Sequence, residues 1–104
     1  SRGLGDVYKR QKLALTGAIK DKLLYMDDIA LYAIDFFKAH YPGRFEDRYQ
    51  LAQGAEKDLS SVDLLLAITG KRGLGDDYDR AATMIVNEIR KGLLGPFSLD
   101  QLGD

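Results

Sequence analysis

The sequence predicts an all-α fold, a small bundle of four to five helices. Three observations favour it: apolar residues recur every three or four positions, no segment alternates with a period of two, and β-branched residues are scattered. The chain has 104 residues, of which 45% are hydrophobic and 30% charged, as expected for one globular domain. A single modest core is therefore expected.

Composition excludes several classes of protein. The absence of cysteine excludes disulfides, thiolate metal sites and cysteine nucleophiles. No apolar run approaches the ~20 residues of a membrane span, so no membrane partner is expected, and no signal-peptide pattern opens the sequence. The net charge of −1 gives no global basic footprint of a dedicated nucleic-acid binder.

Residues 1–11, SRGLGDVYKRQ, are expected to be non-native, because they resemble a peptide left where adapter sequence is translated with a gene. They also match residues 72–80 at seven of nine positions. The similarity stops at once on both sides, whereas a true repeat carries a whole structural unit. Residues 12–104 are therefore expected to form the domain.

The first predicted helix covers residues 12–19, and a charged connector over 20–26 follows it. The strongest helical pattern covers residues 28–40, behind an N-cap at Asp27, and Pro42 ends it. Its apolar side chains recur at helical spacing and are Ile29, Tyr32, Ala33, Phe36, Phe37 and Tyr41.

Pro42 is also suited to the first position of a short helix over 43–49, with Phe45 and Tyr49 on one face. Residues 50–57 are polar and predict a loop. A capping box of Ser60 and Asp63 then starts a helix that ends at Gly70. The apolar residues of that helix are Val62, Leu65, Leu66 and Ile68.

Residues 71–75 predict a basic, glycine-containing loop, after which Asp76 or Asp77 caps the last helix. Arg90 and Lys91 suit the C-terminal end of that helix dipole, Gly92 ends it, and a tail over 93–102 follows. The predicted apolar face is Tyr78, Ala82, Ile85 and Ile89.

No catalytic constellation is recognisable, so the chain is not expected to be an enzyme or to hold a cofactor. The Thr69-Gly70-Lys71 string lacks the other residues of a phosphate-binding loop. His40, the single histidine, is expected to cap the end of its helix. Asp76, Asp77 and Asp79 lack the remaining ligands of a calcium loop, so no metal is expected.

Basic residues gather locally, although an ordinary solvated surface would also explain them. Cations placed this way would contact RNA phosphates without reading the base sequence. The first set of candidate RNA-binding residues is Lys71, Arg72, Arg80, Arg90 and Lys91. The second set is Lys20, Lys38, Arg44 and Arg48. The aromatic residues fall at core-like spacing rather than forming a base-stacking platform.

Six strings in order resemble the C-terminal domain of the ribosome biogenesis GTPase A family, circularly permuted GTPases that act late in large-subunit assembly. The resemblance spans about residues 13–100, and the glycine-rich stretch at 74–76 is shorter than is usual in the family. The strings are LALTGAIKD (13–21), DIALYA (28–33), KAHYPGRFEDRY (38–49), KRG (71–73), DYDRAA (77–82) and IRKGLLG (89–95).

The resemblance implies a GTPase fragment that contacts rRNA on immature large ribosomal subunits. The chain has no P-loop and no NKxD string, so GTP and Mg²⁺ are expected in a G-domain outside it. Residues 16–20 would couple this domain to that G-domain. The expected location is cytoplasmic for a bacterial protein, or the mitochondrial matrix for a eukaryotic homologue.

The alternative is a helical protein-interaction module that packs on the G-domain or on a ribosomal protein and makes no RNA contact. The net negative charge favours it. This alternative predicts an exposed apolar patch that includes Leu13, Leu15, Leu23 or Leu24.

Overall fold

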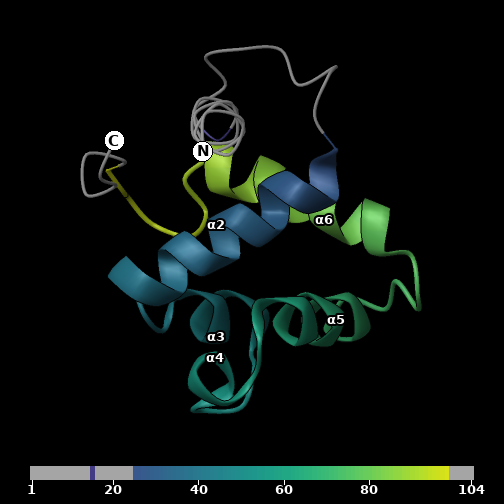
Figure 1. Cartoon of the computed structure of the whole chain (residues 1–104), viewed down its shortest axis with the longest axis horizontal. Helices are drawn as coiled ribbons and strands as arrows, with labels where there is room; N and C mark the ends of the chain where they lie inside the picture. The colour runs from purple at the N-terminus through teal and green to yellow at the C-terminus, as the bar shows by residue number, and fades with distance from the viewer. Residues whose placement is uncertain (1–14, 16–24, 99–104) are drawn as a thin grey trace, which may run out of the picture.

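The computed structural model describes Leu15 and residues 25–98, and within them it holds five helices and no strand. In Figure 1, α2 lies across α6, and α3, α4 and α5 lie below this pair. The main interhelical packing joins α2 to α6 and both of these to α5. The predicted all-α fold is therefore confirmed. The helices are α2 (Met26–His40), α3 (Arg44–Tyr49), α4 (Ala55–Asp58), α5 (Ser61–Lys71) and α6 (Tyr78–Arg90).

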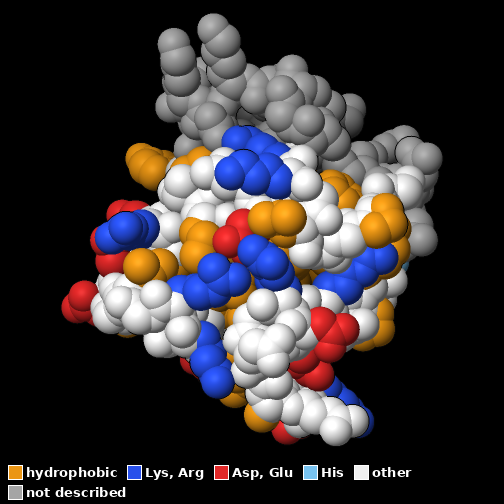
Figure 2. Space-filling view, turned by 180° about the vertical axis from the view of Figure 1, so that it is seen from behind, with side chains coloured by type: hydrophobic (Ala, Val, Ile, Leu, Met, Phe, Trp, Pro, Cys, Tyr) orange, Lys and Arg blue, Asp and Glu red, His pale blue; other side chains and the backbone are white. Residues whose placement is uncertain are grey.

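One apolar core joins the helices. Phe37 lies within it, with its ring centroid 5.7 Å from that of Phe45 and 5.3 Å from that of Phe97. Leu15, from the predicted first helix, has helical backbone and is fully buried. The surface around this core mixes charged side chains with small apolar areas (Figure 2). Other buried members are Ile29, Ala33, Ile34, Phe36, Tyr49, Leu64, Leu65, Ile68, Ala82, Ile85, Val86 and Ile89.

The start of α2 differs from the prediction. The N-cap is Tyr25, whose side chain makes no capping hydrogen bond, and the predicted cap Asp27 lies inside the first turn. The Asp27 carboxylate accepts the N–H of Asp28 at 2.9 Å. The helix starts earlier because Met26 packs against the core, a tertiary contact that outweighs the capping preference of aspartate.

The end of α2 is closed by the backbone, where the Tyr41 N–H donates to the Phe37 carbonyl at 2.7 Å. His40 is exposed, and its ring centroid lies 4.9 Å from that of Phe36. Among the described residues, its imidazole makes this ring contact and no hydrogen bond to a helix carbonyl. The expected capping role of His40 is therefore wrong.

Pro42 does not open α3 as predicted. It lies in a turn, and the N-cap is Gly43 with a left-handed φ of +95°, a conformation that glycine adopts without strain. The predicted shared face of the helix is confirmed, because Phe45 and Tyr49 are both buried with their rings stacked 6.2 Å apart.

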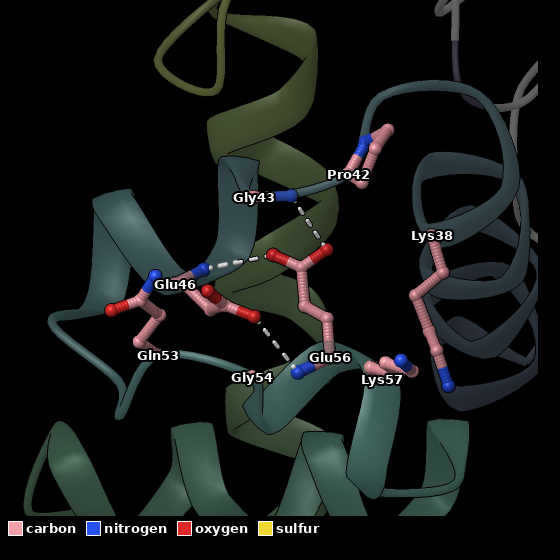
Figure 3. A pocket seen from close by; sticks show the side chains of 8 residues that line it. All are labelled: Lys38, Pro42, Gly43, Glu46, Gln53, Gly54, Glu56 and Lys57. Atoms are coloured by element: carbon pink, nitrogen blue, oxygen red, sulfur yellow. Dashed lines mark hydrogen bonds between the residues drawn. The ribbon is translucent and has the colours of Figure 1, made fainter.

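The predicted loop over 50–57 contains part of a short helix, α4. Glu56 in α4 is only 5% exposed, and its carboxylate accepts the backbone N–H groups of Gly43 at 2.9 Å, Phe45 at 3.0 Å and Glu46 at 3.0 Å. The Glu46 carboxylate in turn accepts the Glu56 N–H at 3.0 Å (Figure 3). Two glutamates therefore cap each other's helices. Helix propensity does not predict this pairing, because the two residues lie on different helices.

The ends of α5 and α6 largely follow the predicted signals. The Ser60 hydroxyl accepts the Asp63 N–H at 3.1 Å, and the Asp77 carboxylate accepts the Arg80 N–H at 3.1 Å, so both N-caps are confirmed. The predicted stop at Gly70 is wrong, since α5 continues to Lys71.

Three side chains predicted on apolar helix faces are exposed: Val62 by 53%, Leu66 by 38% and Tyr78 by 43%. In α5, apolar residues extend around more than one side of the helix, so periodicity alone does not identify the buried side. The predictions for residues 1–11, Lys20, Leu13, Leu23, Leu24 and the coupling segment 16–20 concern positions outside the described residues.

Candidate nucleic-acid interface

The carboxylate of Glu88 on α6 joins two arginines that come from different elements. Arg48 on α3 donates its Nε hydrogen to Oε1 at 3.0 Å. Arg72, the residue that closes α5, donates through Nη1 to Oε2 at 3.5 Å. The hydroxyl of Tyr49 also donates to Oε1, at 3.0 Å. We call Arg48, Tyr49, Arg72 and Glu88 the arginine cluster.

Arg72 is held by more than its ion pair. Its guanidinium carbon lies 4.9 Å from the ring centroid of Tyr49, within the range of a cation–π contact. Its Nη1 also lies 3.9 Å from the sulfur of Met84 on α6. These contacts fix the side chain against two helices, so its position depends on how α3 and α6 pack.

The contacts in the arginine cluster favour the charged forms of Glu88 and Arg48. Burial alone would raise the pKa of Glu88, but hydrogen bonds from Arg48 and Tyr49 and the charge of Arg72 outweigh it, so the pKa lies below its usual value. The hydrogen bond to Glu88 raises the pKa of Arg48. Burial, followed by the Glu88 charge, raises the pKa of Tyr49 well above its usual value. One carboxylate thus faces two guanidinium groups, and a formal charge of +1 remains.

Other predicted cations lie around this cluster. Arg80, Met84, Glu88 and Lys91 follow one another at spacings of four, four and three residues, which places them along one side of α6 and its C-cap. Lys71, which is exposed, directly precedes Arg72. The face of the described structure seen in Figure 2 carries lysine and arginine side chains, with some acidic side chains among them.

Arg44 lies one turn before Arg48 on α3, but its contacts are with the C-terminal segment and with Tyr41. Its guanidinium carbon is 4.2 Å from the ring centroid of Tyr41, and Nη1 donates to the carbonyl of Pro96. An added Cβ at Gly95 would lie 3.3 Å from the guanidinium. Arg44 therefore binds the C-terminal segment to the body of the domain.

Two further predicted cations are not brought to the arginine cluster. Arg90 is two residues beyond Glu88, roughly 200° around the helix, and so lies on the other flank of α6. The ammonium of Lys38 donates to the carbonyl of Leu59 at 2.7 Å. Lys38 and Lys57 both line a surface pocket between the α2–α3 turn and α4 (Figure 3).

The residues that sequence reasoning missed are the ones that order the arginines. Glu88 resembles any exposed acid on a helix, and Tyr49 was expected only as a core residue. A weak signal existed, because Glu88 precedes the buried Ile89 and so lies at the edge of the apolar face. Its two arginine partners are 40 and 16 residues away in sequence, and only the fold brings them together.

Among the described residues, no three histidine or acidic side chains are grouped so that they could hold a metal ion. Asp77, one of the three clustered aspartates, caps α6. No helix in this part of the chain has the length and apolar character needed to cross a membrane.

No family model matches the chain. Over 94 residues it is 44% identical to ribosome biogenesis GTPase A of Priestia megaterium, covering 86% of this chain and 32% of that protein. It is 40% identical to the protein of that name in Bacillus cereus over 86% of this chain, and 35% identical to that of Bacillus licheniformis over 89%. The chain spans about a third of the length of the curated relatives it matches. The predicted resemblance to ribosome biogenesis GTPase A is therefore confirmed, over most of this chain and about a third of those proteins.

Proposed function

We propose that this chain is the helical RNA-contacting part of a GTPase that assists late assembly of the large ribosomal subunit. The names of its relatives support ribosome assembly and GTP hydrolysis as the role of the whole protein. The chain's own sequence has no P-loop or NKxD string, so GTP and Mg²⁺ would be bound by a G-domain to which this part docks. A bacterial protein of this kind would act in the cytoplasm, and a eukaryotic homologue in the mitochondrial matrix.

The observation that supports RNA contact is that Arg48 and Arg72, from two different elements, meet at the Glu88 carboxylate of α6, with exposed Lys71 next to Arg72 in sequence and Lys91 one turn beyond Glu88. Arg48 comes from α3, Lys71 and Arg72 from the end of α5, and Lys91 from the end of α6. Glu88 offsets one of these charges and leaves the others for a polyanion. Contacts to backbone phosphates fix the orientation of a protein on RNA without selecting a sequence.

The test is binding of the 104-residue chain to purified large-subunit rRNA over a series of salt concentrations. We expect the affinity to fall steeply with salt, because each neutralised phosphate releases counterions. Lys71→Gln and Lys91→Gln should each reduce the slope of log affinity against log salt by roughly 0.7–0.9. Lys57→Gln, which removes an equal charge from the exposed end of α4, is the matched control and should leave the slope unchanged.

Binding that does not depend on salt, or equal effects of the three lysine variants, would contradict RNA contact through this face. The unchanged binding of the Lys57 control separates a local interface from a general effect of net charge.

The second candidate is a surface that contacts protein instead of RNA. The patch predicted for it is partly wrong, because Leu15 is completely buried. A different observation favours a protein-contact surface: Val62 and Leu66 are exposed one turn apart on α5. Changing both to serine should leave rRNA binding intact under the first proposal, whereas the second predicts loss of association with the G-domain or a ribosomal protein.

A further inference from the structure

We infer that Arg48 and Arg72 form a preorganised pair that binds a backbone phosphate of RNA, and that Glu88 is the positioning residue of this pair. The inference rests on the proposed function and deepens it, since it assigns the phosphate contact to two residues and gives the acid between them a role in binding.

The hydrogen bonds of Glu88 leave both arginines with donors to spare. Its carboxylate accepts three hydrogen bonds, and its side chain is only 13% exposed. The side chains of Arg48 and Arg72 are 32% and 33% exposed. A guanidinium has five N–H donors, and Glu88 takes one from each arginine. The donors left over can reach phosphate oxygens, for which the planar guanidinium is well suited.

The two arginines are also fixed before any ligand arrives. Arg72 is held between the Tyr49 ring and Met84, and Arg48 by its hydrogen bond to Glu88. Ordering a long, flexible side chain during binding weakens affinity. Here that cost is met during folding, because Glu88, Tyr49 and Met84 belong to packed helices.

The inference makes a prediction opposite to that of simple charge counting. Glu88→Gln removes a negative charge, so charge alone would strengthen RNA binding. If Glu88 positions the arginines, its replacement should weaken binding by about tenfold, since Arg48 loses the group that holds it and Arg72 keeps only its contacts with Tyr49 and Met84, so the RNA must order the pair. Asp47→Asn is the matched control: Asp47 is exposed on α3 and its loss removes the same charge. We expect this control to bind about twofold more tightly at low salt.

The measurement is the affinity of the 104-residue chain for large-subunit rRNA at several salt concentrations, after circular dichroism has shown that each variant is folded. Glu88→Gln binding as tightly as Asp47→Asn, or more tightly, would overturn the inference and leave the proposed function intact. Absence of salt-dependent binding by the unaltered chain would instead overturn the proposed function itself.

A second variant keeps the test decisive if Glu88→Gln does not fold. Arg48→Lys preserves the positive charge but loses the planar donor group that meets both Glu88 and a phosphate. We expect about fivefold weaker binding with an unchanged salt slope, because the number of charges is the same. Unchanged affinity in this variant would contradict the inference.

Discussion

Replacing Glu56 by alanine should destabilise the fold more than any surface change nearby. The carboxylate is buried at the turn between α2 and α3 and accepts three backbone N–H groups, those of Gly43, Phe45 and Glu46. These include donors at the start of α3 that have no acceptor within that helix. Alanine leaves all three without their partner.

The magnitude can be worked out from the positions of the three donors. A stranded donor costs about 1–3 kcal/mol when it is buried. The N–H of Phe45 is buried, while those of Gly43 and Glu46 are partly buried, so we use about 1 kcal/mol for each donor. The sum is about 3 kcal/mol, which is a large share of the ~5–15 kcal/mol that stabilises a typical domain.

Urea unfolding followed by far-ultraviolet circular dichroism measures this loss directly, and the melting temperature should fall by roughly 12–24 °C. Glu46→Ala breaks one hydrogen bond, to the N–H of Glu56, and should cost about 1 kcal/mol. Lys57→Ala, at the exposed next position, is the control for a change of helix propensity. If Glu56→Ala lowers the free energy of unfolding no more than Lys57→Ala does, Glu56 does not stabilise the start of α3 by capping it.

Three further predictions concern the arginine cluster, the C-terminal segment and the core. Because the pKa of Glu88 is lowered in the folded state, its contribution to stability is complete above its ordinary pKa of about 4.3 and is lost as the pH falls through the folded value. Between about pH 5 and pH 3, the free energy of unfolding of Glu88→Gln should therefore fall less than that of the unaltered chain, as measured by urea titrations. Gly95→Ala should cost about 1–2 kcal/mol, more than Gly73→Ala, because both have positive φ but only the Cβ at position 95 meets Arg44; equal thermal shifts would contradict this. Ile85→Ala should cost about 3 kcal/mol in urea unfolding, since Ile85 is fully buried between packed helices, and a cost below about 1 kcal/mol would show that this packing is wrong.

The candidate site was only partly predictable, and the reason is the range of the interactions involved. Basic residues near the ends of α5 and α6 are visible as short strings, so Arg72 and Lys91 could be named from sequence. Whether a cation is available for RNA depends on its partners. Arg44 binds the carbonyl of Pro96 and Lys38 that of Leu59, and these contacts span 52 and 21 residues.

Local chemistry determined the helical class, most helix bounds and the caps at Ser60 and Asp77, because each depends on residues within one or two turns. Tertiary structure decided where α2 begins, that α4 exists, and that Glu88 lies between two arginines. These features depend on burial and on carboxylates that meet groups from another helix. Such contacts produce no periodic pattern in the sequence, because the sequence does not distinguish a buried acidic residue from an exposed one.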